Sequence, residues 1–253
     1  MFRIIRARLR QGHRTVDYPR QVPPLPDRFR GRPAVDAAKC PADCRACVQA
    51  CPAGAIQHTG RRLAIDLGRC LFCGQCEGKC GHGAIRFTNE YRLAARGRDD
   101  LRVMDSEARL AQALDRQMQR LFGRSLKLRQ VSAGGCSACE ADVNVLGTLV
   151  YDLGRFGIQF VASPRHADGV LVTGPITANM RLALSKTYAA IPAPKLVIAA
   201  GACAIAGGPY AGHAETNSGV GDLLPVDLYI PGCPPHPLTL LDGLLRLLGR
   251  IAD

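Results

Sequence analysis

The sequence has no tryptophan, and aromatic residues make up only 5% of its 253 residues. Its arginines are therefore not interleaved with the stacking side chains that single-stranded nucleic acid needs. Long apolar runs are also missing, since the longest, Leu196–Gly208, is too short and too rich in glycine for a membrane-spanning helix. The opening residues alternate arginines with apolar side chains and offer no cleavage site, which argues against a secretory signal. We expect a cytoplasmic chain with no transmembrane segment.

Acidic residues are scarce in the first half of the chain. Residues 1–130 hold 26 Lys/Arg against 12 Asp/Glu, a net charge of +14, whereas residues 131–253 hold 7 against 9, a net charge of −2. This asymmetry predicts a domain boundary near residue 130. The basic half suits an acidic partner, an anionic membrane surface or nucleic acid, and a solvated arginine-rich surface is the plainer interpretation.

Cysteine, in contrast, is abundant, with 12 residues. Cytoplasmic thiols stay reduced, so a dense cysteine pattern there indicates metal binding or catalysis and not a disulfide framework. The stretch CRACVQACPAGAI (44–56) matches CGQCEGKCGHGAI (73–85), which predicts a pseudo-symmetric module. The second run has the spacing C-x2-C-x2-C-x3-C of bacterial ferredoxins, in which the fourth cysteine of each run ligates the other cluster.

Applied to this chain, that crossing predicts two [4Fe-4S] clusters. The first would have Cys40, Cys44, Cys47 and Cys80 as ligands, and the second Cys51, Cys70, Cys73 and Cys76. Zinc is the alternative, although zinc sites usually consist of two CxxC pairs separated by a longer spacer. The first run is irregular, because three residues separate Cys40 from Cys44, which predicts a distorted loop or an altered cluster. Gly81 replaces the usual proline after Cys80, a change expected to affect only a turn.

From residue 126 onwards, short apolar strands alternate with helical stretches. The strand candidates are LKLRQV, IQFVAS, GVLVTG, KLVIAAG and DLYIPG, and the helical candidates lie at about 139–155, 176–190 and 236–250. This pattern predicts an α/β domain with a flavodoxin-like parallel sheet. Four cysteines follow strand candidates: Cys136, Cys139, Cys203 and Cys233. Since ligands bind at the carboxyl edge of such sheets, we expect these four to converge on a third cluster.

The domain organisation follows from these patterns. We expect an N-terminal docking arm at 1–36, a two-cluster ferredoxin-like α+β domain at 37–95, a linker helix within 96–125 and the α/β domain at 126–253. The arm begins with FRIIRARLRQ, which could form a short basic amphipathic helix, and continues with proline-rich sequence. The linker helix is expected over 105–123, opened by Asp105 or Ser106 and closed by Gly123.

Several of these segments resemble a known family. The motifs are GGCSACEAD, VASPRHADGVLVTGP, GACAIAGGPY and PGCPPHP. Residues 125–248 resemble the small subunit of [NiFe]-hydrogenases, especially the energy-converting membrane-bound type of formate hydrogenlyase, and the related cluster-bearing subunit of respiratory complex I. Residues 1–90, with RTVDYP and PDRFRGRP, resemble the two-cluster ferredoxin-like subunit of the same complexes. The resemblance implies a fusion of two neighbouring subunits.

By this resemblance, the third cluster would lie proximal to the active site of a separate large subunit. The two residues between Cys136 and Cys139 are hydrogenase-like, because the complex I subunit has adjacent cysteines there. Glu140 fits the hydrogenase pattern, whereas Asp142 stands where that pattern usually has glutamate.

The resulting hypothesis is an electron-transfer subunit with three [4Fe-4S] clusters and no complete catalytic site of its own. Expected partners are a large hydrogenase-like subunit, membrane-arm subunits and an external electron carrier or dehydrogenase subunit, on the cytoplasmic side of the inner membrane. One alternative is a complex I-like oxidoreductase without nickel, and a more remote one is a zinc-binding nucleic-acid module. Arg165 is expected to tune cluster potentials. Four histidines near cysteine motifs are expected to be neighbours of ligands and not ligands: His82, His166, His213 and His236.

Overall fold

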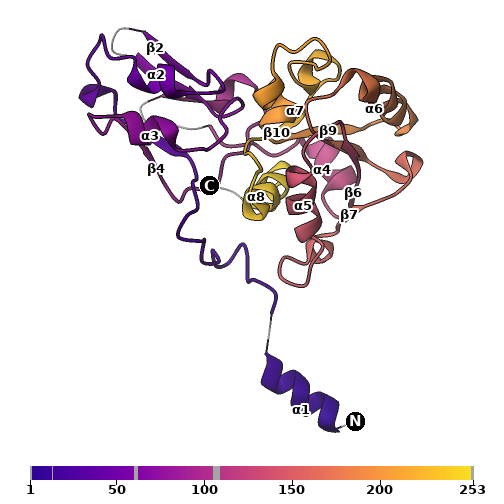
Figure 1. The fold of residues 1–253 in the computed structure, drawn as a ribbon. Helices are drawn as coiled ribbons and strands as arrows, with labels where there is room; N and C mark the ends of the chain where they lie inside the picture. The colour runs from indigo at the N-terminus through magenta and orange to yellow at the C-terminus, as the bar shows by residue number, and fades with distance from the viewer. Residues whose placement is uncertain (1, 13, 60–61, 105–108, 252–253) are drawn as a thin grey trace.

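The computed structural model describes residues 2–12, 14–59, 62–104 and 109–251. Figure 1 shows two packed parts and a helix, α1 (Phe2–Gln11), that projects away from both. Among the described residues, no helix is long and apolar enough to cross a membrane.

The first part is a small α+β unit built from two short sheets. In one, β1 (Pro33–Val35) pairs antiparallel with β4 (Ile85–Phe87); in the other, β3 (Arg62–Asp66) lies between β2 (Ile56–Thr59) and β5 (Arg102–Met104). The helices α2 (Ala46–Ala50) and α3 (Gln75–Lys79) occupy equivalent positions in the sequence repeat and pack on each other. Alternation in β3 buries Leu63 and Ile65, as expected for a strand with one face on the core. The ferredoxin-like α+β prediction is confirmed.

The second part is a five-stranded, wholly parallel sheet in the order β10-β9-β8-β6-β7. Its strands are β6 (Leu126–Ser132), β7 (Ile158–Phe160), β8 (Gly169–Thr173), β9 (Leu196–Ala200) and β10 (Leu228–Ile230). The helices that connect or cover them are α5 (Ala138–Val145), α6 (Ala178–Ala190), α7 (Ala202–Ala206) and α8 (Pro237–Leu247). Every residue of β8 and β9 is buried, as in sheets covered on both faces. The predicted α/β domain is confirmed.

Short 3-10 helices complete the connections. They are η1 (Ala37–Lys39), η2 (Asp99–Leu101), η3 (Leu153–Phe156), η4 (Pro164–His166), η5 (Gly208–Tyr210) and η6 (Val220–Asp222).

The connecting helix is shorter than the sequence predicted. Its first expected residues, 105–108, lie outside the described residues, and α4 spans only Arg116–Phe122, capped by the Asp115 side chain and ended by Gly123. The preceding segment is held by tertiary hydrogen bonds instead, because the Ala111 amide donates to Ala94 and the Leu114 amide to Leu247. These longer-range partners replace the first helical turns that the apolar periodicity predicted. Strand β5 also lies within the stretch 96–125, where only a linker was expected.

The proline-rich arm after α1 lies on the chain itself and links its two parts. At its start, the Val16 amide donates to Val150 at 2.8 Å, and Arg155 donates to the carbonyls of Val16 and Tyr18. At its end, the Gly31 amide donates to Thr88 at 2.7 Å, next to β4. The arm therefore runs from the α/β part to the small α+β part.

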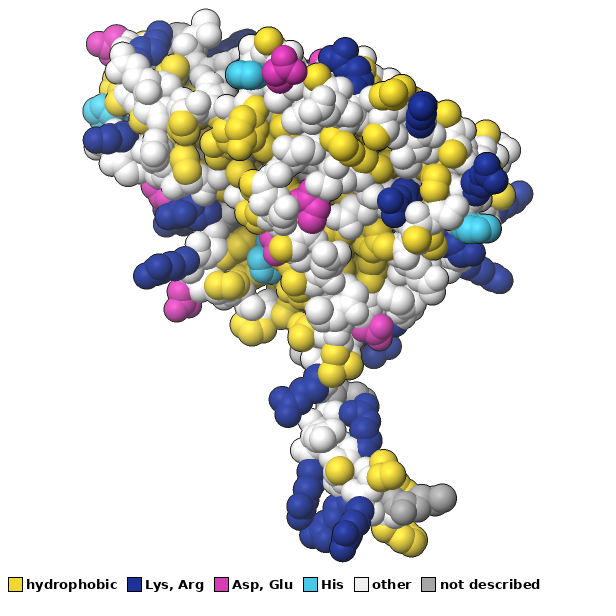
Figure 2. Space-filling model, turned by 45° about the vertical axis from the view of Figure 1, so that its right-hand side comes forward, with side chains coloured by type: hydrophobic (Ala, Val, Ile, Leu, Met, Phe, Trp, Pro, Cys, Tyr) yellow, Lys and Arg dark blue, Asp and Glu magenta, His cyan; other side chains and the backbone are white. Residues whose placement is uncertain are grey.

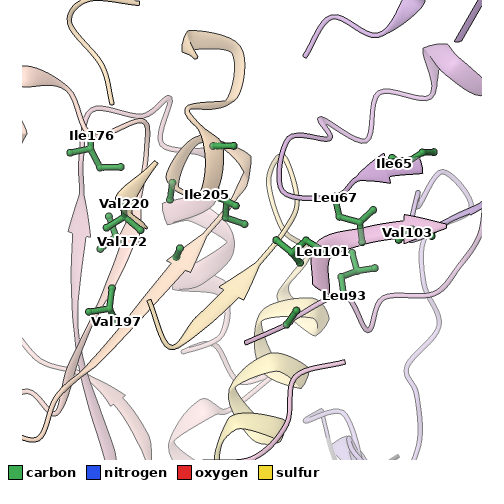
Figure 3. Close-up of a cluster of buried hydrophobic side chains, with 14 of the residues drawn as sticks. Ile65, Leu67, Leu93, Leu101, Val103, Val172, Ile176, Val197, Ile205 and Val220 are labelled. Carbon is green, nitrogen blue, oxygen red and sulfur yellow. The ribbon is translucent and has the colours of Figure 1, made fainter. Parts of the chain in front are cut away.

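The two parts also share a continuous apolar core, shown in Figure 3. Leu67 and Leu101 from the first part belong to the same buried cluster as Ile205 and Val220 from the second. Contact is close at Gly68, where an added Cβ would lie 2.7 Å from Cγ2 of Ile205. Because a fully buried leucine contributes roughly 1.5–3 kcal/mol, this core fixes the two parts relative to each other.

Candidate metal centres

All twelve cysteines are free thiols, and the predicted ligand sets divide them into three groups of four. Group A contains Cys40, Cys44, Cys47 and Cys80. Burial raises the pKa of Cys40, and repulsion from Cys44 and Cys80 adds to the rise. Burial likewise raises the pKa of Cys47, with further repulsion from Cys40 and Cys80. The structure thus places the last cysteine of the second run beside the first three of the first run.

Group B contains Cys51, Cys70, Cys73 and Cys76, which line one small apolar cavity together with side chains such as Ile65 and Phe87. Burial raises the pKa of Cys70 to about 12, opposed by the Phe72 amide and reinforced by the other three thiols. Burial also raises the pKa of Cys76 to about 11. Burial thus opposes ionisation of these thiols, and a bound cation would reverse this because a coordinating thiol is deprotonated.

The sequence repeat is preserved in the backbone hydrogen bonds to sulfur. The Ala55 amide donates to Sγ of Cys51 at 3.2 Å, and the Ala84 amide donates to Sγ of Cys80 at 3.2 Å. Both turns require a glycine with positive φ, Gly54 at 58° and Gly83 at 62°. The shared ending GAI of the two runs therefore encodes the same turn, which aims one N–H group at a thiol in each half.

The irregular loop of the first run has side-chain neighbours that the sequence analysis did not single out. His58, at the end of β2, is 9% exposed, and its Nε2 atom lies 3.7 Å from Sγ of Cys40. Its Nδ1 atom lies 2.7 Å from Nη1 of Arg45. The signal that could have found it is the repeat itself, because His58 stands two residues after the shared GAI, where the second half has Phe87.

That His82, His166, His213 and His236 are neighbours of ligands and not ligands stays a prediction. His82, His166 and His213 are exposed. The half-buried His236 accepts a hydrogen bond from the Leu238 amide through Nδ1 and so caps α8. Arg165 is also exposed, and its predicted tuning role stays a prediction.

Group C contains Cys136, Cys139, Cys203 and Cys233, and it lies at the carboxyl edge of the parallel sheet. These residues follow β6, β9 and β10, so three loops bring them together. The first loop leaves β6 where the strand order reverses, since β7 lies on one side of β6 and β8 on the other. Such a switch point is the usual binding crevice of an open α/β sheet.

The space around group C depends on glycine. An added Cβ on Gly201 would lie 2.7 Å from Sγ of Cys139, and one on Gly208 would lie 2.6 Å from Sγ of Cys203. Burial raises the pKa of Cys203 to about 11, with repulsion from Cys233 and Cys136. Burial and then the neighbouring Glu140 raise the pKa of Cys139 further.

Two acidic residues follow Cys139 on α5. Burial acts to raise the pKa of Glu140, but hydrogen bonds from Ser132 and Thr173 outweigh it and lower the pKa; the Thr173 hydroxyl donates at 2.5 Å. Burial raises the pKa of the half-buried Asp142. Glu140 is therefore held as a hydrogen-bonded carboxylate beside group C.

Thiols of groups A and B, and of groups B and C, are close enough to affect one another's pKa. Cys47 of group A contributes to the raised pKa of Cys76 in group B, and Cys73 of group B contributes to that of Cys233 in group C. A pocket lined by Phe72, Cys233 and His236, among others, spans the junction between the two parts of the molecule.

The donor chemistry fits iron–sulfur clusters. Each group offers four thiols, the ligand set of a [4Fe-4S] cluster, and backbone N–H groups already point at sulfur atoms. Within the described ranges, no three Cys, His, Asp or Glu side chains are grouped to hold a single metal ion. The thiols of a [4Fe-4S] cluster need not converge on one point as the ligands of a single ion do, because the four thiolates bind four separate iron atoms.

Comparisons with known proteins match the two parts of the molecule separately. A family model of the NADH ubiquinone oxidoreductase 20 Kd subunit matches residues 136–247, and a model of the 4Fe-4S dicluster domain matches residues 29–85. A probable membrane-bound hydrogenase subunit of Pyrococcus furiosus is 39% identical over 136 residues, which are 54% of this chain and 81% of that protein. An NADH-quinone oxidoreductase subunit of Citrifermentans bemidjiense is 44% identical over 119 residues, 47% of this chain and 69% of that protein.

Among solved structures, a chain of the membrane-bound sulfane sulfur reductase, an archaeal respiratory membrane complex, is similar at 34% identity with a TM-score of 0.47. The match covers 54% of this chain and 75% of that one.

Proposed function

The chain belongs to the family of the NADH ubiquinone oxidoreductase 20 Kd subunit and also contains a 4Fe-4S dicluster domain, and we therefore propose that it carries three [4Fe-4S] clusters as an electron relay. It is an electron-transfer subunit of an oxidoreductase complex. Three clusters are supported by the closeness of the thiols within each set: the four of group B line one cavity, and repulsion from other thiols of their sets raises the pKa of Cys40 and Cys139.

In this proposal each thiol group holds one cluster. Group A provides Cys40, Cys44, Cys47 and Cys80; group B provides Cys51, Cys70, Cys73 and Cys76; group C provides Cys136, Cys139, Cys203 and Cys233. When bound, the clusters supply one-electron carriers. The domain boundaries at residues 37, 96 and 126 are part of the same proposal.

The residues of the chain set the conditions for transfer. Apolar side chains such as Ile65 and Phe87 line the cavity of group B, and amide donors such as those of Ala55 and Ala84 stabilise negative charge on sulfur. The shared core around Leu101 and Ile205 keeps groups B and C at a constant separation. A relay needs this rigidity because the distance between its carriers must not vary.

Group C is the end of the relay that would face a large catalytic subunit. Two of its thiols, Cys136 and Cys233, are exposed, whereas group B has one exposed thiol, Cys73, and group A has none. We propose a large hydrogenase-like subunit, membrane-arm subunits and an external electron carrier or dehydrogenase subunit as partners. The names of the relatives support this assembly, since they belong to a membrane-bound hydrogenase and to NADH-quinone oxidoreductases.

Two versions of the assembly differ in the metal of the large subunit. The two residues between Cys136 and Cys139 favour the hydrogenase type, and the alternative is a complex I-like oxidoreductase without nickel. Nickel analysis and hydrogen turnover of the purified complex distinguish them. Nickel together with hydrogen turnover supports the first version, and quinone reduction without nickel supports the second.

The relay itself is tested by counting electrons. We expect the anaerobically purified chain to take up about three electrons, one per cluster, in a reductive titration followed by electron paramagnetic resonance (EPR). Uptake of no electrons would contradict the proposal.

The helix α1 supports a peripheral position on the cytoplasmic face of the inner membrane. Its apolar residues Phe2, Ile5 and Leu9 are exposed along one stripe, beside arginines such as Arg3 and Arg6. Figure 2 shows these basic and apolar side chains together on the projecting helix. Amphipathic basic helices of this kind lie in the interface of anionic membranes.

A further inference from the structure

The two halves of the dicluster domain are unequal where they meet their thiols. Aligning the repeat 44–56 with 73–85 pairs Arg45 with Gly74, and continuing it by two residues pairs His58 with Phe87. In the second half, Phe87 contacts Phe72 edge-on, with ring centroids 6.2 Å apart, and lines the apolar cavity of group B. The first half therefore has a basic pair, Arg45 and His58, at the positions where the second half has a glycine and a phenylalanine.

The basic pair also holds the irregular loop. Nη1 of Arg45 donates to the carbonyls of Ala42 and Cys44, each at 3.0 Å. The Cys44 amide donates to Pro41 at 3.1 Å, so the three residues between Cys40 and Cys44 form a closed turn. The extra residue of this loop is thus accommodated by defined partners, and the turn keeps Cys40 next to His58.

The orientation of the His58 ring follows from its neighbours. A coordinating thiolate can only accept hydrogen bonds, so the ring nitrogen that faces Sγ of Cys40, Nε2, must carry the hydrogen. On the other side of the ring, the guanidinium of Arg45 has only donors and lies 2.7 Å from Nδ1. Nδ1 also lies 2.6 Å from the Cys44 carbonyl, which can only accept. A neutral ring accepts from Arg45 at Nδ1, and a protonated ring donates from Nδ1 to this carbonyl; in both forms Nε2 carries the hydrogen that faces Cys40.

We propose that Arg45 and His58 form a relay of hydrogen bonds to Sγ of Cys40, and that this relay makes the reduction potential of the group A cluster more positive than that of group B. The inference rests on the proposed function, because it needs a cluster at group A. Reduction adds a negative charge to a cluster, and hydrogen bonds donated to its sulfur ligands stabilise that charge. The always-charged Arg45 strengthens the effect through the ring. Both residues are positioning residues that act through Cys40.

The test is a redox titration of the full-length, anaerobically purified chain, followed by EPR. H58F places here the phenylalanine found at the equivalent position of the second half. In this variant one midpoint potential should become more negative by about 59 mV, which is roughly a tenfold change in the equilibrium constant of a one-electron reduction. The other two midpoints should not move. In H58Q, whose amide can still donate, the shift should be smaller, and R45Q should shift the same midpoint in the same direction.

A matched control is F87L, which changes the equivalent position of the second half without adding a donor and should leave the group A midpoint in place. The inference is overturned if H58F and H58Q keep their iron and show wild-type midpoints. It is also overturned if both lose about four iron, since His58 would then be needed to hold the cluster and not to tune it. Wild-type protein without iron would instead contradict the proposed function, so the two failures are distinguishable.

Discussion

The two parts of the molecule bring four thiols together in different ways. In the dicluster domain, three cysteines of each group lie within one short loop and helix, and only the fourth comes from the other run. In the α/β domain, Cys136 and Cys233 are 97 positions apart (233 − 136), and the parallel topology brings them to one edge. The first arrangement depends on local spacing, and the second depends on the whole sheet. We therefore expect that loss of tertiary structure separates the thiols of group C before those of groups A and B.

The largest expected effect tests the crossing within the dicluster domain. The double variant C40A/C80A should lose about four iron, because both residues belong to group A. The double variant C40A/C51A should lose about eight, because its residues belong to different groups. Iron analysis of the purified chains checks this. If C40A/C51A instead lost about four and C40A/C80A about eight, each run would hold its own cluster and the crossing would be wrong.

The next effect tests the dependence of group C on backbone space. G201A should lose about four iron, because its Cβ would lie 2.7 Å from Sγ of Cys139. The matched control is G212A, whose φ of 82° is similar to the 92° of Gly201 but which has no neighbour within 4 Å of the added Cβ. G212A should keep all its iron. Equal losses from both variants would mean that backbone strain, and not contact with the thiol, is responsible.

The sequence predicted the dicluster domain well because its signals are local. The spacing of the second run and the repeat predict crossed thiol groups, and in the structure Cys80 is close enough to Cys40 to raise its pKa. The five strands and the position of group C followed from apolar strands ending in glycine and cysteine. Their actual order in the sheet, with β6 between β7 and β8, was not readable from the chain.

What escaped prediction depends on contacts between distant residues. The first turns of the expected linker helix are absent at 109–115, since Leu114 pairs with Leu247. His58 was overlooked because its nearest cysteine in sequence, Cys51, is not the one it contacts. The arm was expected to dock on a partner, and residues 15–32 lie on the chain itself. A deletion of residues 1–34 would therefore disturb the packing of the two domains as well as any membrane contact.

A smaller effect is expected where the arm is fastened to the α/β domain. Asp242 is fully buried on α8, accepts a hydrogen bond from the Tyr18 hydroxyl at 2.8 Å and pairs with Arg246 at 2.9 Å. Burial raises the pKa of Asp242, although both partners oppose the rise. D242A should lower the free energy of unfolding by about 3–5 kcal/mol, the usual cost of removing one partner of a buried ion pair.

Urea denaturation followed by circular dichroism measures this change. The control is D222A at an exposed position, which should stay within about 0.5 kcal/mol of the wild type. Y18F should fall between the two variants, because it removes only the hydrogen bond. Wild-type stability of D242A would show that the arm does not depend on this network.

The smallest effect is expected at α1. R3Q/R6Q should weaken binding to vesicles containing anionic lipid on the order of tenfold, because each arginine near such a surface contributes to attraction. Sedimentation with vesicles checks this, and added salt should reduce the difference by screening. The control R96Q/R116Q, placed on the body of the protein, should bind as the wild type does. Equal binding by all three chains would rule out α1 as a membrane contact.

The most direct test of three clusters is the iron, acid-labile sulfide and zinc content of the anaerobically purified chain. Three [4Fe-4S] clusters require about twelve iron and twelve sulfide per chain, with no zinc. About eight of each would contradict the claim for one group, and the iron content of G201A and C40A/C80A would then show which group is empty. Zinc in place of iron and sulfide would overturn the relay altogether.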